Sequence, residues 1–160
     1  MSRGRDDDGQ RDLKSVWGLH DREDHWALDV EGRTVDACRF DFGLTLVVPD
    51  GVTESLAIRI EEPFHMVDGP TERHLDPGAD PRAMHPALAV LRRRLTAVLI
   101  FKHGGLEISL DEGEVGLRVP ASQHYEAWTI TDTAGSVIAS LPGGGVAFWR
   151  QADTADTAGA

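Results

Sequence analysis

Alternating apolar and polar positions recur through the middle of the chain and predict short β-strands. Every second residue is apolar in two segments of the same design, namely Leu44, Leu46 and Val48 in the first and Leu106, Ile108 and Leu110 in the second. A period of two places each trio on one face of a strand. A shorter alternating stretch, residues 26–30, predicts one more strand ahead of them.

These segments belong to an internal repeat. FDFGLTLVVPDG, from Phe40, matches FKHGGLEISLDEG, from Phe101, in an aromatic residue, a glycine turn, alternating apolar positions and a second glycine turn. The match places the two phenylalanines at equivalent positions, and each copy reads as a three-stranded meander. We expect positive φ angles in the tight turns at Gly43, Gly51, Gly104 and Gly113.

Each copy then continues into a further hairpin, and the second copy gains a last strand, GVAFWR. The hairpins are expected to turn at Asp68-Gly69 and around Ala134-Gly135. A repeat of this size cannot bury its own apolar face well, so two related sheets packed together are the expected result. The boundaries that follow are about residues 35–77 for repeat one, 96–142 for repeat two and 144–150 for the final strand.

A proline-rich segment, LDPGADPR, links the repeats and predicts a helix start at Pro81 with Asp80 as its cap. Because Pro86 interrupts the backbone hydrogen bonds, the well-formed helix is expected over residues 84–95. Its apolar positions at helical spacing are Leu88, Leu91 and Leu95. The predicted fold class is therefore α+β, mainly β: two duplicated antiparallel meander and hairpin units packed together, with one linking α-helix. A sandwich and a partly closed barrel both fit this pattern.

The length of 160 residues suits one domain, expected over residues 16–150. Hydrophobic residues make up 41% and charged residues 27% of the chain, which is typical of a folded protein. The polar segments 1–15 and 151–160 are expected to be disordered tails.

The net charge of −11 argues against binding to nucleic acid or to an anionic membrane, since both require clustered Lys and Arg. The single cysteine, Cys38, cannot form an internal disulfide, and its alternation with Phe40 predicts an inert thiol on the apolar face. No apolar run resembles a signal peptide or approaches the length of a membrane span. We therefore expect a cytoplasmic protein.

Seven histidines raise the question of a metal site, but His20 and His25 lie five residues apart in an expected loop. The set His65, His74 and His85 also lacks a recognised ligand spacing, so surface or capping histidines are predicted. No serine or cysteine lies in a nucleophile-elbow pattern, and a strand rather than a helix follows the glycines at 143–145. The sequence therefore predicts no catalytic, cofactor-binding or metal-binding residues.

The segment HYEAWTI combines aromatic residues with a charge and is the candidate contact site. Tyr125, Trp128 and Trp149 could form an aromatic anchor patch for a partner or ligand, with Glu126 at its rim. In a strand with alternating side chains, Tyr125 and Trp128 point to opposite faces. One of the two rings is therefore expected in the core.

The motifs YEAWTIT and SLPGGGVAFWR resemble the C-terminal strands of a family of small uncharacterised domains common in high-GC Gram-positive bacteria. DFGLTLVVPDG, EEPF and LDP are similar to that family as well, so the resemblance covers about residues 26–150. The acidic N-terminal extension and the hairpin DEGEVGLRVP depart from the family pattern. The resemblance implies a fold unit, but no activity, cofactor or site residue.

The leading functional hypothesis is a non-enzymatic binding or accessory module, of immunity type, that binds a basic protein through an acidic surface. Its basis is the net charge together with the small β-rich domain. The alternative is a small-molecule-binding protein or enzyme with a pocket between the two repeats. A homodimer through exposed edge strands is a third reading.

Overall fold

The fold is known from a computed structural model, which describes residues 18–49 and 55–150. The expected tails, residues 1–15 and 151–160, and the turn glycine Gly51 lie outside the described residues. The strands are β1 (Leu19–Asp21), β2 (His25–Leu28), β3 (Ala37–Phe40), β4 (Leu44–Pro49), β5 (Ser55–Ile60), β6 (Phe64–Asp68), β7 (Thr71–Leu75), β8 (Leu95–Phe101), β9 (Leu106–Leu110), β10 (Val115–Val119), β11 (Trp128–Asp132), β12 (Ser136–Ser140) and β13 (Val146–Arg150). Two 3₁₀ helices, η1 (Pro81–Val90) and η2 (Asp111–Gly113), complete the described elements.

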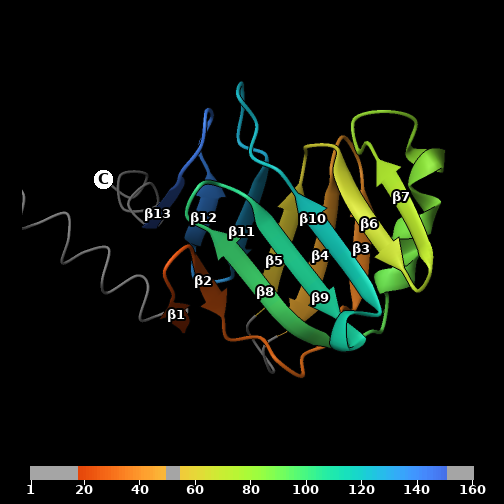
Figure 1. The fold of residues 1–160 in the computed structure, drawn as a ribbon, viewed down its shortest axis with the longest axis horizontal. Helices are drawn as coiled ribbons and strands as arrows, with labels where there is room; N and C mark the ends of the chain where they lie inside the picture. The colour runs from red at the N-terminus through yellow and green to blue at the C-terminus, as the bar shows by residue number, and fades with distance from the viewer. Residues whose placement is uncertain (1–17, 50–54, 151–160) are drawn as a thin grey trace, which may run out of the picture.

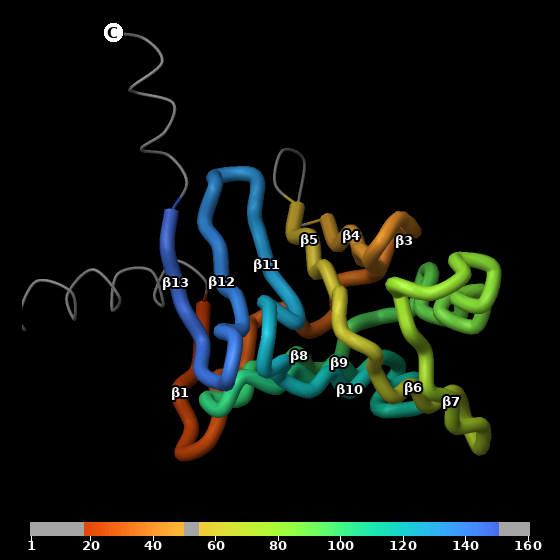
Figure 2. Tube along the Cα trace, turned by 90° about the horizontal axis from the view of Figure 1, so that it is seen from above, coloured from red at the N-terminus to blue at the C-terminus, as the bar shows by residue number. Residues whose placement is uncertain are grey.

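The strands form two antiparallel sheets that pack face to face. The seven-stranded sheet has the order β1-β2-β8-β9-β10-β6-β7, and the six-stranded sheet has the order β13-β12-β11-β5-β4-β3. In Figure 1 the six-stranded sheet lies behind the seven-stranded one, and Figure 2 shows both layers from above. The predicted fold class, mainly antiparallel β with one linking helix, is confirmed, and the arrangement is a sandwich.

The two repeats exchange their hairpins between the sheets. Repeat one places its meander, β3-β4-β5, in the six-stranded sheet and its hairpin, β6-β7, in the seven-stranded sheet. Repeat two does the reverse with β8-β9-β10 and β11-β12. Each meander is therefore extended by the hairpin of the other repeat, through the pairs β10 with β6 and β5 with β11. The predicted duplication thus appears in the topology as an approximate twofold relation.

The core lies between the sheets and contains the predicted alternating residues. Both trios are buried, with exposed fractions of at most 1%: Leu44, Leu46, Val48, Leu106, Ile108 and Leu110. Phe40 and Phe101 each end the first strand of a meander, as the repeat predicts. Their surroundings differ, because Phe40 packs against the core whereas Phe101 stacks on the ring of His103.

The linking helix differs from the expected α-helix over residues 84–95. It is a 3₁₀ helix that ends at Val90, and Leu95 already begins β8. With three residues per turn its buried face is Met84, Ala87 and Val90. Leu88, expected on the apolar face, is 47% exposed. The expected start is confirmed, since the Asp80 carboxylate accepts a hydrogen bond from the Arg82 amide at 3.0 Å.

The turn glycines divide into two kinds. Gly104 and Gly113 have φ angles of 111° and 90°, as expected, but Gly43 does not have a positive φ. A Cβ at Gly43 would lie 2.9 Å from the guanidinium carbon of Arg59, which pairs with Asp41 at 2.9 Å. The arginine side chain can move away, but the backbone carbonyl oxygen of Ile60 would also lie only 3.1 Å from this Cβ, so close packing and not a left-handed backbone disfavours a side chain at position 43.

Candidate functional site

The four residues of the expected aromatic patch do not lie together in the structure. Trp128 is completely buried, and its indole Nε1 donates a hydrogen bond to the carbonyl oxygen of Gly104 at 2.8 Å. Trp149 lies on β13, two strands away from Trp128, and pairs with Val137 of β12. Its neighbour Phe148 turns inward instead. Trp128 is therefore a core residue, as one ring of the patch was expected to be.

Tyr125 and Glu126 lie in the loop before β11, where Tyr125 is 43% exposed and Glu126 is partly buried. A hydrogen bond to the Glu62 carboxylate, with a smaller contribution from burial, raises the pKa of the Tyr125 hydroxyl. The tyrosine hydroxyl thus lies near Glu62, in the segment between β5 and β6. A role in contacting a partner or ligand stays a prediction for both residues.

A hollow with a volume of about 540 Å³ lies on the outer face of the seven-stranded sheet. We call it the histidine hollow. Its polar and aromatic lining residues are His65, His74, Phe101, His103, Glu107 and Arg118. The outer face of this sheet is turned toward the viewer in Figure 1, because the six-stranded sheet lies behind it.

Strand register brings four of these side chains into one row. His74 pairs with His65 across β7 and β6, His65 with Arg118 across β6 and β10, and Arg118 with Glu107 across β10 and β9. Residues paired in this way share a face of the sheet, and alternation turns them away from the buried core. The row crosses the seam between the repeats, since β6 belongs to repeat one and β10 to repeat two.

The fixed charges in the histidine hollow are one guanidinium and one carboxylate. Arg118 donates from Nε to the Glu107 carboxylate at 2.8 Å, while its side chain stays 72% exposed. The terminal nitrogens of Arg118 therefore keep donors that face solvent. His65 lies 3.9 Å from the carboxylate of Glu72, at the limit of an ion pair. The row consequently carries three basic side chains and one paired acid, Glu107, with the carboxylate of Glu72 beside His65.

Two stacked aromatic rings, those of Phe101 and His103, line part of the histidine hollow. The rings of Phe101 and His103 stack with their centroids 5.4 Å apart and an interplanar angle of 20°. His25 covers another side of Phe101, at 5.6 Å, and is itself bonded to Asp24 at 2.6 Å. A planar group entering the hollow would meet ring faces that are already held in place.

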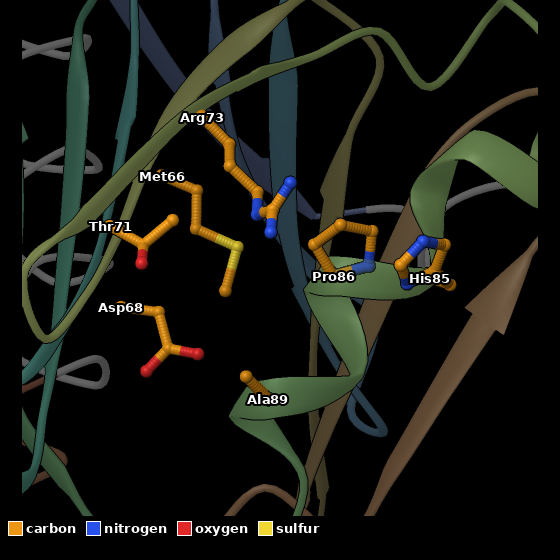
Figure 3. Close-up of a pocket in the computed structure, with 7 residues that line it drawn as sticks. All are labelled: Met66, Asp68, Thr71, Arg73, His85, Pro86 and Ala89. Carbon is orange, nitrogen blue, oxygen red and sulfur yellow. The ribbon is translucent and has the colours of Figure 1, made fainter.

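A second, smaller hollow of about 290 Å³ lies between η1 and the β6-β7 hairpin. We call it the helix cleft; the seven residues drawn in Figure 3 line it. Arg73, Met66, Thr71 and Asp68 enter it from the hairpin, and η1 supplies the opposite wall. The hairpin thus faces a different hollow on each of its two sides.

From the sequence, His65 and His74 were predicted to be surface or capping histidines. His103 and Arg118 were not identified as candidate site residues. The two-residue loop of this hairpin is Gly69-Pro70, one residue later than the expected turn at Asp68-Gly69. This loop sets His65 opposite His74, whereas a loop at Asp68-Gly69 would have set His65 opposite Glu72. Their alignment with Arg118 depends on the pairing of β6 with β10, which no local pattern encodes.

Within residues 18–49 and 55–150 no group of three or more His, Cys, Asp and Glu side chains could hold a metal ion. The described helices include none that is long and apolar enough to cross a membrane. Cys38 lies on β3, partly buried, and burial raises the pKa of its thiol to about 11.

A family model described as a family of unknown function (DUF6188) matches residues 26–150. This range is the one over which a resemblance to an uncharacterised family was expected from the sequence. That the family is bacterial and common in high-GC Gram-positive bacteria stays a prediction. No curated protein and no solved structure matches the chain.

Proposed function

Since the chain belongs to DUF6188, a family of unknown function, we propose on structural grounds that it is a non-enzymatic binding module whose histidine hollow takes a small anionic ligand with a planar apolar part. The observation that carries the proposal is the placement of three imidazoles and one guanidinium around an apolar hollow at the seam of the repeats. The position of the hollow at the seam of the repeats supports the alternative interpretation of the sequence, which proposes a pocket between the two repeats; the hollow itself lies on the outer sheet face.

The size and lining of the hollow support a small ligand. Its volume of about 540 Å³ falls within the range of roughly 300 to 1,000 Å³ that is common for small-molecule sites. Pro63 and Pro120 add apolar surface beside the Phe101 ring, and the polar groups are few and convergent. Such a lining favours a ligand that combines a flat apolar body with one polar end.

The charge of the lining supports an anion. Arg118 keeps free donors beside its contact with Glu107, and His65, His74 and His103 can each donate from a ring nitrogen. Hydrogen bonds from a guanidinium to a carboxylate or phosphate are among the strongest that a protein offers. In a chain with a net charge of −11, this concentration of basic side chains favours selective anion binding over general attraction.

The lining also favours binding over catalysis. The hollow contains no serine, threonine, cysteine or lysine, and its one carboxylate, Glu107, is engaged by Arg118. Covalent catalysis needs a nucleophile within reach of a base, which this set of residues does not supply.

The test is an NMR titration of the folded chain with 2-naphthoate, and with 2-naphthamide as the neutral analogue of the same shape. We expect saturable amide shifts on β6, β9 and β10 with naphthoate, and at least fivefold weaker binding of the amide. Arg118→Gln and the double variant His65→Gln, His74→Gln should weaken naphthoate binding to a similar extent. His85→Gln, an exposed histidine outside the hollow, is the matched control. Shifts confined to other surfaces, or equal binding of acid and amide, would refute the proposal.

A second candidate function is a cytoplasmic accessory or immunity-type protein that binds a basic protein partner. The net charge of −11 favours it, because an acidic surface accelerates encounter with a basic partner. Capture from a native lysate at low and at high salt tests this candidate. If no captured protein is released by high salt, this candidate function is contradicted. A homodimer formed through edge strands would be detected separately, by light scattering.

A further inference from the structure

The helix cleft presents opposite charges that have no ionic partner in the described structure. Register places Met66 opposite Arg73 and Asp68 opposite Thr71, so Asp68 and Arg73 are diagonal neighbours on one face of the hairpin. Diagonal neighbours lie within reach of long side chains. Even so, no ion pair joins Asp68 to Arg73, nor either of them to another described residue.

Figure 3 shows how the cleft separates these charges. The guanidinium of Arg73 extends toward Pro86, whereas the carboxylate of Asp68 lies on the side of Ala89. The thioether of Met66 lies between them. Met66 is buried while Arg73 is exposed, so an apolar floor lies beneath open charged walls.

We propose that the helix cleft binds a zwitterionic α-amino acid with an apolar side chain. Arg73 would pair with the ligand carboxylate and Asp68 with its ammonium group, while Met66, Pro86 and Ala89 contact the side chain. A ligand with both charges satisfies the guanidinium and the carboxylate together, which neither a simple anion nor a simple cation does. The volume of about 290 Å³ lies just below the range of roughly 300 to 1,000 Å³ that is common for ligand sites, and this suits a molecule as small as an amino acid.

This site is separate from the histidine hollow. Alternation along β6 and β7 turns His65 and His74 to the outer face and Met66 and Arg73 to the face that η1 covers. A substitution that removes binding at one site therefore leaves the lining residues of the other site unchanged. The two proposals fail or succeed independently.

The experiment is an NMR titration of the full chain with L-leucine. Two analogues serve as charge controls: N-acetyl-L-leucine lacks the ammonium group, and L-leucinamide lacks the carboxylate. We expect saturable shifts on β6, β7 and η1 with leucine, and at least tenfold weaker binding of both analogues. Equal binding of leucine and either analogue, or shifts that map outside the cleft, would overturn the proposal.

Variants of the cleft give an independent check. Asp68→Asn and Arg73→Gln should each weaken leucine binding at least tenfold, whereas Glu72→Gln, between them on the opposite face, should leave it unchanged. Ala89→Leu keeps both charges, but its larger side chain occupies the cleft. This variant should therefore abolish leucine binding, while its amide NMR spectrum should remain that of a folded chain. Unchanged leucine affinity in Ala89→Leu would show that the ligand does not occupy the cleft.

Discussion

Replacing Trp128 with phenylalanine tests whether this residue acts in the core or at a surface. Its side chain has no exposed surface, and its indole Nε1 donates to the carbonyl oxygen of Gly104 at 2.8 Å. Trp128 opens β11, while Gly104 lies in the turn between β8 and β9. The hydrogen bond therefore ties the six-stranded sheet to the seven-stranded sheet at one end of the sandwich.

Two losses add up in Trp128→Phe. Phenylalanine has about three fewer non-hydrogen atoms in its side chain than tryptophan, and the lost packing lowers the free energy of unfolding by about 1 to 2 kcal/mol. Gly104 is buried, so its carbonyl oxygen loses its partner at a cost of about 1 to 3 kcal/mol. We expect the free energy of unfolding to fall by about 3 kcal/mol, which corresponds to a decrease in Tm of about 10 °C for a chain of this size.

The measurement is urea denaturation followed by far-ultraviolet circular dichroism, because the substitution changes the tryptophan fluorescence. Trp149→Phe is the matched control, since Trp149 is only partly buried on the edge strand β13 and should lose no more than about 1 kcal/mol. Equal losses in the two variants, or a loss below about 1 kcal/mol in Trp128→Phe, would refute the assignment of Trp128 to the core.

Three further predictions follow from individual residues. Gly104→Ala should cost about 2 to 4 kcal/mol in urea denaturation, because φ is 111° and a Cβ would lie 2.9 Å from that of Ala121. Gly69→Ala, with φ 57° and open space, should cost only about 1 kcal/mol, so equal costs would contradict the steric argument. Since burial raises the pKa of Cys38 from 9.0 to about 11, its alkylation at about pH 8 should be roughly a hundredfold slower in the folded than in the unfolded chain. Because the chain has one tyrosine, an absorbance titration reports the pKa of Tyr125 directly. Glu62→Gln should lower this raised pKa toward the ordinary value of tyrosine. An unchanged titration midpoint in Glu62→Gln would exclude the hydrogen bond to Glu62.

Local patterns in the sequence predicted most of the strands and their duplication. The expected loop around His20 and His25 was wrong, because His20 lies in β1 and His25 begins β2. Period-two alternation identified the buried residues of β4 and β9 because every second position of each strand carries a large aliphatic side chain. The helix was less well predicted: spacing of 3.6 residues selected Leu88, whereas the 3₁₀ geometry buries Met84, Ala87 and Val90. Two prolines, Pro81 and Pro86, remove amide donors from this segment, and the resulting geometry could not be read from hydrophobic spacing alone.

The candidate sites could not be predicted in the same way because they depend on the exchange of hairpins. Alternation shows which residues of β6 share a face, but it does not say which strand pairs with β6. If each hairpin stayed beside its own meander, β6 would adjoin β5, and His65 would lie far from Arg118 and Glu107. Exchange instead places β6 against β10 and completes the row of basic side chains across the seam.

The same exchange explains why one hairpin serves two hollows. β6-β7 ends the seven-stranded sheet beside η1, so its inner face near the turn meets a short helix instead of a full opposing sheet. A charged pair such as Asp68 and Arg73 is tolerated there, whereas deeper in the sandwich an uncompensated charge would be costly. The outer face of the β6-β7 hairpin is open as well. Polar side chains can therefore gather on both faces of this hairpin, at the place where repeat one extends the sheet of repeat two.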